Sequence, residues 1–219
     1  MRALRPIFVP SSKRGSLFEW VDIEFEWFPG FAAVQKEKSI SSLHLAAKNQ
    51  GLYPILEVST KSNEEVGRRL SAFNLKLEVD GEMLSLESVY QGSKVFSESG
   101  QHIDLMYKNP YDAKKLVRQV GIGNIVGFRC FGMDFPTEPK NAFYDWLYIR
   151  AISPHETWVK KNLAYAGYSD IEFNPKRSIN CQGRAVAEFM SLVNLGASED
   201  CFNDFNTFRD LLRLSQRHG

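Results

Sequence analysis

The chain has 219 residues, and its 27 lysines and arginines are balanced by 26 aspartates and glutamates, so the formal net charge is +1. This balance excludes a protein that coats nucleic acid broadly, because such a protein needs a large excess of Lys and Arg. A hydrophobic share of 43% is enough to bury the core of one domain, or of one domain with an appendage, and excludes disorder for most of the chain.

The three cysteines, Cys130, Cys181 and Cys201, are odd in number and lack the paired spacing of a zinc site. They predict a reduced, cytoplasmic protein, and the four scattered histidines suggest no metal centre. No apolar run typical of a signal peptide precedes Lys13, and no segment has the length of a membrane span. We therefore expect a cytoplasmic protein without a metal ion, a cofactor or a membrane partner.

The first 60 residues predict strands and one helix. Val21, Ile23, Phe25 and Trp27 alternate with acidic residues, which is the pattern of a half-buried strand. Apolar runs at residues 7–9 and 55–58 favour two more strands, and residues 36–48 favour a helix. We assign residues 1–60 to an N-terminal extension packed on the core, and residues 61–219 to the main domain.

The second part of the chain is predicted to begin with a hairpin and to continue mainly as helices. Asp80 and Gly81 separate two apolar segments and adopt positive φ readily, which indicates a tight hairpin. Helices are predicted at residues 85–97 and 137–150, from Ser153 onward, and after the potential caps Asn180 and Ser198. The fold class is therefore α+β, a mainly helical domain with a small β-hairpin and a β-containing N-terminal extension.

Four polar residues of the helix predicted at 85–97 share one face. Glu87, Tyr90, Gln91 and Lys94 are spaced i, i+3, i+4 and i+7, which places them on one stripe. The stripe is either a solvated face or the wall of a site. In a site it would supply a carboxylate for proton transfer, an amide for hydroxyl recognition, and an amine that becomes a nucleophile once burial lowers its pKa.

Asp145 lies in a segment, residues 143–149, whose other members are aromatic or aliphatic. An unpaired buried charge costs several kcal/mol, so this carboxylate needs a partner. It is either paired structurally, with Arg150 or Arg129 as candidates, or it serves a site lined by aromatic rings. Trp146 beside it is either a core residue or a stacking surface for a base.

A polar, basic loop at residues 173–184 precedes a predicted helix. Lys176, Arg177 and Arg184 surround Asn180, and Gly183 would let a ligand or a neighbouring backbone come close. A helix N-terminus offers free N–H groups and a positive dipole end, so the loop either holds a pyrophosphate or is a solvated turn capped by Asn180. The sequence contains no dinucleotide-binding glycine fingerprint, P-loop or nucleophile elbow.

Several motifs resemble one known family. The run from Leu70 to Asn74, the Asp80-Gly81 turn and the run from Leu86 to Phe96 resemble, in order and spacing, the NADAR (YbiA-like) pattern L-S-N-F, D-G and V-E-H-Y-x-Q-A-x-K-F. Residues 143–146, 174–185, 5–8 and 24–30 resemble the branch that accompanies DarT-type DNA ADP-ribosyltransferase toxins as the antitoxin. Within this branch the resemblance extends from about residue 5 to residue 195.

The resemblance implies an N-glycosidase with a NADAR-like fold that removes ADP-ribose from guanine in DNA, or in RNA, as the antitoxin to a cognate ADP-ribosyltransferase toxin. It implies that Lys94 attacks the anomeric carbon to form a Schiff base, that Glu87 moves protons, and that Asp145 orients the ribose or shares that role. It further implies that Ser71, Phe73 and Asn74 bind the ribose. The phosphates would be bound by Asn180, Gln182, Gly183 and Arg184. Released ADP-ribose would be the product.

Two positions depart from the family pattern, and other functions stay open. Ala72 replaces the usual Asn and Ser88 the usual His, so we expect neither residue to contact a ligand directly. One alternative is a riboflavin-pathway N-glycosidase that acts on a small phosphorylated aminopyrimidine. Another is a non-catalytic antitoxin that binds ADP-ribose or the toxin.

Overall fold

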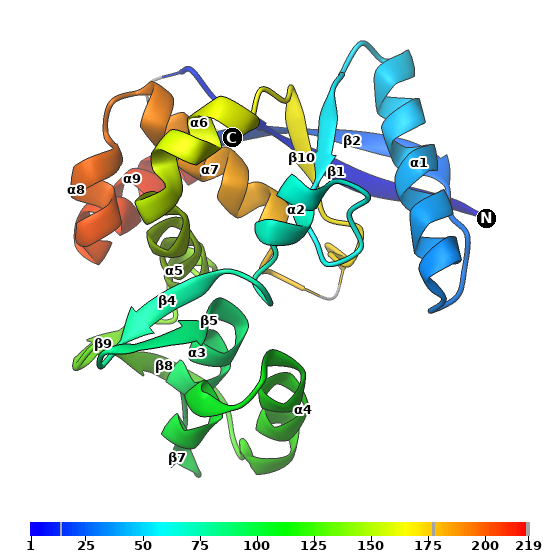
Figure 1. The fold of residues 1–219 in the computed structure, drawn as a ribbon. Helices are drawn as coiled ribbons and strands as arrows, with labels where there is room; N and C mark the ends of the chain where they lie inside the picture. The colour runs from blue at the N-terminus through cyan, green and yellow to red at the C-terminus, as the bar shows by residue number, and fades with distance from the viewer. Residues whose placement is uncertain (14, 177, 218–219) are drawn as a thin grey trace.

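A computed structural model of the chain describes residues 1–13, 15–176 and 178–217. Its first sheet has four strands in the order β2-β1-β10-β3 (Figure 1). The strands are β1 (Arg2–Pro10), β2 (Phe18–Glu26), β3 (Ile55–Glu57) and β10 (Gly167–Ser169). β1 pairs antiparallel with β2 and, through Phe8 opposite Tyr168, with β10, whereas β10 runs parallel to β3. The N-terminal residues thus share a sheet with a strand from late in the chain.

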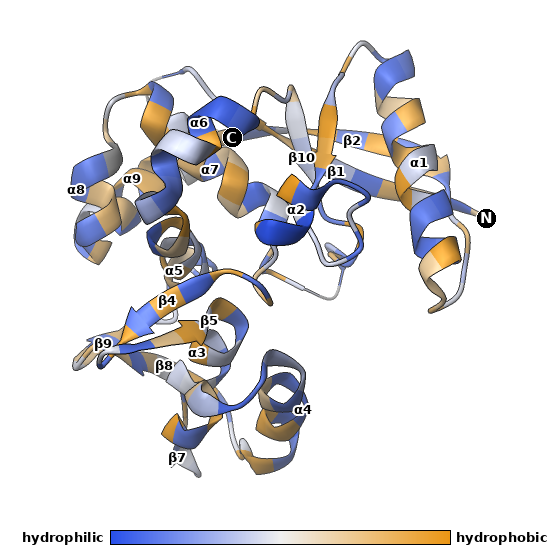
Figure 2. Cartoon of the chain, viewed as in Figure 1, coloured by the Kyte–Doolittle hydropathy of each residue, from blue (hydrophilic) through white to orange (hydrophobic). Residues whose placement is uncertain are grey.

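One face of this sheet is covered by helix α1 (Ala33–Asn49), where the sequence predicts a helix. Ile23 and Phe25 of β2 join Ile40 and Leu43 of α1 in a small core. The alternation of hydrophobic and hydrophilic residues along β2 is visible in Figure 2. It is only partly reflected in burial, because Ile23 and Phe25 are buried whereas Val21 is 38% exposed.

The main core surrounds helix α5 (Ala142–Ile152), in which all residues from Ala142 to Ile149 are buried. Helix α7 (Gln182–Asn194) packs against α5 and against β1. The remaining helical elements around them are α2 (Glu65–Arg69), the 3-10 turn η2 (Ser153–His155), α6 (Glu156–Asn162), α8 (Ser198–Asn203) and α9 (Phe205–Arg217). None of the helices in the described ranges is long and apolar enough to cross a membrane.

The predicted hairpin is confirmed. Strands β4 (Lys76–Val79) and β5 (Glu82–Ser85) are joined by Asp80 and Gly81, with φ values of 51° and 82°. After the hairpin come α3 (Leu86–Ser93), the 3-10 turn η1 (Ile103–Tyr107) and α4 (Pro110–Val120). A further sheet has the order β7-β6-β8-β9, formed by Gly100–Gln101, Lys94–Phe96, Ile125–Cys130 and Met133–Phe135.

The α+β class is confirmed, while two details of the prediction are corrected. The helix predicted at residues 85–97 ends at Ser93, and the chain continues as β6 in a sheet that the sequence did not predict. The predicted caps Asn180 and Ser198 do not cap α7 and α8, because Cys181 and Ala197 occupy the N-cap positions. The boundary at residue 60 stays a prediction; strands from both sides of it pair in the first sheet.

Candidate active site

A pocket of about 570 Å³ lies where α1, α3, α4 and the loops beside β10 meet. Its walls come from segments that are far apart in sequence, from Phe31 to Gln182. The lining residues are Phe31, Lys36, Ser59, Thr60, Lys61, Ser71, Phe73, Glu87, Tyr90, Gln91, Lys94, Tyr111, Lys114, Val117, Arg118, Tyr144, Asp170, Glu172, Phe173, Ser178, Asn180 and Gln182. The volume is in the range of pockets that hold small molecules and cofactors.

The N-terminus of α3 fixes one wall of the pocket. Ser85 caps the helix by accepting a hydrogen bond from the Ser88 N–H, and the carbonyls of Leu75 and Ala72 accept the N–H groups of Leu86 and Glu87 at 2.9 Å. These bonds satisfy N–H groups that a helix start otherwise leaves without partners. They also tie the loop that carries Ser71 and Phe73 to the helix that carries Glu87.

Lys94 follows the end of this helix. With φ −64° and ψ 132° it is already extended, yet its Nζ donates a 2.6 Å hydrogen bond to Oε1 of Gln91. Nζ also lies 4.7 Å from the centre of the Tyr90 ring. Burial lowers the pKa of Lys94 to about 8, with Lys114 and Arg118 acting in the same direction and Glu87 against them. At pH 7 about a tenth of the Lys94 amines are then neutral, against about one in 3,000 at the ordinary lysine pKa.

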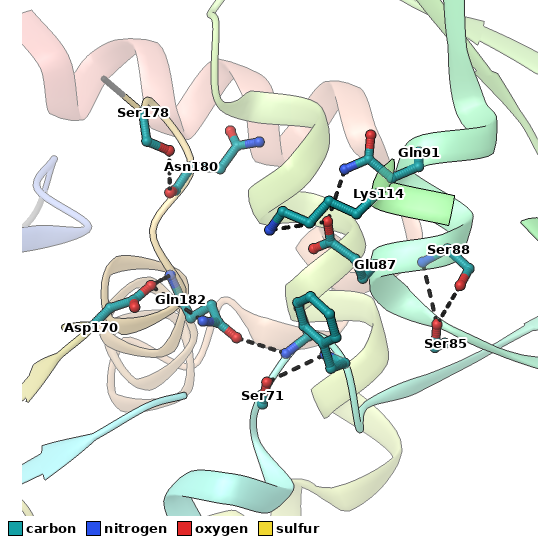
Figure 3. Close-up of polar contacts among 12 residues, drawn as sticks. Ser71, Ser85, Glu87, Ser88, Gln91, Lys114, Asp170, Ser178, Asn180 and Gln182 are labelled. Atoms are coloured by element: carbon teal, nitrogen blue, oxygen red, sulfur yellow. Dashed lines mark hydrogen bonds and ion pairs between the residues drawn. The ribbon is translucent and has the colours of Figure 1, made fainter. Parts of the chain in front are cut away.

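Glu87 is 5% exposed and is held by two side chains. Nε2 of Gln91 donates to its Oε1 at 2.8 Å, and Nζ of Lys114, from α4, lies 3.4 Å from the same oxygen. Figure 3 shows Glu87 between these two side chains. One amide therefore connects the carboxylate to the amine of Lys94, while a second lysine compensates the buried negative charge.

The opposite wall holds a carboxyl group that the sequence reasoning missed. Asp170 directly follows β10 and is 6% exposed. Its Oδ2 accepts the backbone N–H of Gln182 at 3.0 Å and the Gln182 amide at 3.3 Å, while Oε1 of Gln182 accepts the N–H of Ala72 at 2.8 Å (Figure 3). Burial raises the pKa of Asp170 to about 6. A second buried carboxyl group, Glu57, has its pKa raised to about 7 by burial and by Asp170.

Asp145 does not line the pocket. It is fully buried and accepts hydrogen bonds from Nη2 of Arg184 at 3.1 and 2.9 Å and from the amide of Asn141. Nε of Arg184 lies 3.5 Å from Oε1 of buried Glu188, without a hydrogen bond. Burial raises the pKa of both Asp145 and Glu188. Of the alternatives left open by the sequence, this geometry is structural pairing, with Arg184 as the partner instead of Arg150 or Arg129.

Trp146 also lies away from the pocket. It is fully buried, packs edge-to-face against Phe131 and Phe205 and at a tilt against Phe135, and donates its indole N–H to the Cys201 carbonyl. Its environment is that of a core residue.

The loop predicted to bind phosphate contributes differently from expectation. Ser178, Asn180 and Gln182 line the pocket, whereas Lys176, Gly183 and Arg184 do not. The helix N–H at Gln182 is occupied by Asp170, and a Cβ at Gly183 would lie 3.1 Å from the Tyr168 carbonyl. The glycine thus allows β10 to approach α7. Arg177 lies outside the described residues.

The predicted site residues therefore divide into two groups. The pocket brings together Glu87, Lys94, Ser71, Phe73, Tyr90, Gln91, Asn180 and Gln182. Asn74 is outside the pocket, and its amide donates to the carbonyl of Arg68. Ala72 and Ser88, the two departures from the family pattern, do not line the pocket either.

Four further cations in the lining were not singled out in the sequence: Lys36, Lys61, Lys114 and Arg118. Lys36 pairs with Glu172 at 3.0 Å. The Phe73 ring lies 4.8 Å from that of Tyr111 and 5.2 Å from Nζ of Lys114. The spacing of Lys114 and Arg118 by one helical turn was the available signal, since it places both on one face of α4. With Lys94 the pocket has five cations against three acidic residues, which favours an anionic ligand.

Within the described part of the chain, no group of three or more His, Cys, Asp or Glu side chains is arranged to hold a metal ion. A partly neutral lysine next to a buried carboxylate is the arrangement used for nucleophilic attack on a carbonyl or anomeric carbon.

The fold and the pocket define an α+β protein with a lysine of lowered pKa in a cavity where cations outnumber acidic residues. The chain belongs to the DarT1-associated NADAR antitoxin family, whose model matches residues 3–218. The family predicted from the motifs is thereby confirmed. No curated protein sequence gives a significant match to the chain.

Proposed function

We propose that this antitoxin is an N-glycosidase that releases ADP-ribose from ADP-ribosylated guanine in DNA, the modification made by its cognate toxin. The observation that carries the proposal is the Lys94 amine, which has a pKa of about 8 and is linked through Gln91 to Glu87. Membership of the antitoxin family supports the biological role. The three cysteines are free and buried, which agrees with a reducing cytoplasm as the location.

The proposed reaction proceeds in two steps. Nζ of Lys94 forms a bond to the anomeric carbon, and the bonds from this carbon to the ring oxygen and to the guanine nitrogen break. The two hydrogens that the amine loses end on the ring oxygen and on guanine, which leaves a Schiff base between Lys94 and ADP-ribose. Water then adds to the same carbon, and free ADP-ribose and the amine are formed.

Two carboxyl groups flank this route. We assign proton transfer during ring opening to Glu87, which lies on the same wall as Lys94. We assign protonation of the departing guanine to Asp170, whose pKa of about 6 leaves a fraction of it protonated near neutral pH. In this scheme Asp145 does not contact the substrate. It pairs with Arg184 and thereby holds the first turn of α7 in place.

The lining also offers contacts to the rest of the substrate. Lys61 and Arg118 add positive charge that suits a pyrophosphate. The adjacent rings of Phe73 and Tyr111 offer an apolar surface for a base. Hydrogen-bonding groups for ribose hydroxyls are present on Ser71, Asn180 and Gln182.

The experiment that tests the proposal is incubation with a guanine-ADP-ribosylated oligonucleotide, with released ADP-ribose measured by chromatography. Borohydride added during turnover reduces the Schiff base and leaves ADP-ribose attached to Lys94, which mass spectrometry locates. Lys94→Ala is expected to abolish both release and adduct while the protein stays folded. Full activity of this variant would refute the lysine mechanism.

The same assay separates the alternatives. Release from modified RNA but not from DNA would change the substrate, and hydrolysis of a phosphorylated aminopyrimidine alone would indicate a riboflavin-pathway N-glycosidase. Protection of toxin-expressing cells by Lys94→Ala as strong as that by wild type would indicate a binding antitoxin. Under the proposal, Lys94→Ala gives no protection.

A further inference from the structure

A row of four aromatic rings leads from the pocket to the open face of strands β1 and β2. Phe173 lines the pocket, and its ring centre lies 6.3 Å from that of Phe8. Phe8 is 5.7 Å from Phe18, and Phe18 is 6.0 Å from Trp20. Phe173 and Phe8 are buried, whereas Trp20 is 51% exposed. The row therefore ends in an indole that faces solvent.

These four rings line a second cavity, a groove of about 860 Å³. Phe173 belongs to the lining of both the pocket and the groove, so the two are neighbours. The other lining residues of the groove are Met1, Arg2, Ala3, Leu4, Arg5, Pro6, Asp22, Trp27, Asn174, Pro175, Lys176 and Arg184.

The groove is positively charged. Its lining contains the cations Arg2, Arg5, Lys176 and Arg184 and one acidic residue, Asp22. Arg184 forms a buried ion pair with Asp145, and Arg2 forms an exposed ion pair with Glu24.

Of the two arginines on β1, Arg5 has the less compensated charge. Its guanidinium lies 5.4 Å from the centre of the Trp27 ring, and its Nε is buried without a hydrogen-bond partner among the described residues. A buried donor without a partner is costly, and a ligand oxygen would satisfy it. Lys176, in the loop that separates groove and pocket, is exposed.

A substrate that places an ADP-ribosylated guanine in the pocket continues on both sides as DNA. Because Lys94 and Glu87 line a concave pocket and Glu87 is buried, this guanine has to leave any base pair before its anomeric carbon reaches them. Grooves that combine cations with exposed aromatic rings are typical binding sites for single-stranded nucleic acid.

We propose that the groove between β1, β2 and the loop of Lys176 binds the single-stranded DNA next to the modified guanine. Trp20 stacks on a neighbouring base, and Arg5 and Lys176 contact phosphates. The proposal rests on the proposed function, since it extends the substrate of the same pocket. The charge of the groove favours DNA over the toxin as its occupant.

The test compares two substrates, the ADP-ribosylated guanosine monophosphate and a single-stranded oligonucleotide of about 12 residues with one modified guanine. Trp20→Ala is expected to lower kcat/KM for the oligonucleotide about fivefold to a hundredfold and to leave the mononucleotide unchanged. Trp20→Phe, which keeps a stacking ring, is expected to restore most of the loss. Tyr107→Ala serves as the control, because Tyr107 is a similarly exposed aromatic residue outside both cavities.

Binding of an unmodified single-stranded oligonucleotide, followed by fluorescence anisotropy, gives a readout that does not need hydrolysis. If wild type releases no ADP-ribose from either substrate but Trp20→Ala still weakens this binding, the proposed function fails and the groove stands. An equal loss of kcat/KM on both substrates in a folded Trp20→Ala variant would overturn the proposal that the groove binds DNA. A Trp20→Ala variant that handles both substrates normally but no longer binds the toxin would assign the groove to a protein instead.

Discussion

The Lys94 amine donates a 2.6 Å hydrogen bond to Gln91, so a neutral amide, not a carboxylate, is its direct partner. A carboxylate in that place would stabilise the ammonium form and raise the pKa of the lysine. Gln91 also donates a 2.8 Å hydrogen bond to the Glu87 carboxylate. Its amide therefore lies between this carboxylate and the Lys94 amine. The amide thereby preserves the neutral fraction of the Lys94 amine.

Replacing this amide by an acid gives the first prediction. Gln91→Glu places a negative charge next to Lys94, so the pKa of Lys94 should rise above 8 and its neutral fraction at pH 7 should fall. We expect kcat/KM at pH 7 to be at least tenfold below that of wild type, and this difference to narrow above pH 8, where Lys94 of wild type is already mostly neutral. The pH dependence of kcat/KM measures the shift, and an unchanged profile would contradict the role of Gln91.

The second prediction concerns stability. The pKa of Lys94 is lower in the folded chain, about 8, than in an unfolded one, where it is ordinary. The residue therefore destabilises the fold at all pH values below about 8, and this effect disappears as the pH rises through 8 toward 10.5.

Lys94→Met, which keeps most of the volume, should stabilise the protein by about 1–2 kcal/mol at pH 7, after allowance for partial exposure and the lost bond to Gln91. The gain should shrink by pH 9.5. Urea unfolding at the two pH values tests this, and a gain that does not depend on pH would show that the charge is not its cause.

The third prediction addresses Asp170. With a protonated Asp170 and a neutral Lys94 both required, kcat/KM should rise to about pH 6, stay level to about pH 8 and then decline. Asp170→Asn cannot donate the proton, so we expect a loss of 10²-fold or more and no decline above pH 8. If this variant keeps an activity close to that of wild type, Asp170 is not the acid that protonates the departing guanine.

The fourth prediction concerns Arg184, which compensates two buried carboxyl groups. Arg184→Ala leaves Asp145 and Glu188 without their cation and should destabilise the fold by about 3–5 kcal/mol. The matched control is Arg129→Ala, which removes an exposed pair with Asp134 and should cost less than about 1 kcal/mol. Chemical unfolding of both variants provides the comparison, and equal losses would mean that burial of the pair is unimportant.

The sequence predicted those parts of the structure that depend on local pattern. The Asp80-Gly81 turn follows from the ease of positive φ, and the helix predicted at residues 36–48 is present as α1, which begins three residues earlier and ends one residue later. The end of α3 at Ser93 was not predictable in this way. Lys94 leaves the helix because β6 pairs with β8, with Lys94 opposite Phe128, and such long-range pairing leaves no mark on the local sequence.

The same distinction between local pattern and long-range contact decides which residues of the candidate site were predicted. Glu87, Gln91 and Lys94 were found because they are close in sequence. Asp170 was missed and Asp145 preferred, since an acidic residue among aromatics signals only that a partner exists and does not say which one. The Asp145 partner, Arg184, is 39 residues away, and Asp170 enters the pocket through a strand whose neighbours come from the first 60 residues.

The hydrogen bond from the Ala72 backbone to Gln182 joins residues 110 positions apart, and both belong to segments that form the pocket. During synthesis, Glu87 and Lys94 leave the ribosome before Asp170 and α7, so while the 76 residues from position 95 to position 170 are made the chain has one wall of the pocket but not the other. The pocket is therefore complete only in a chain that has been made at least as far as Gln182, and a proteolytic cut that removes residues 167–194 would take one of its walls away.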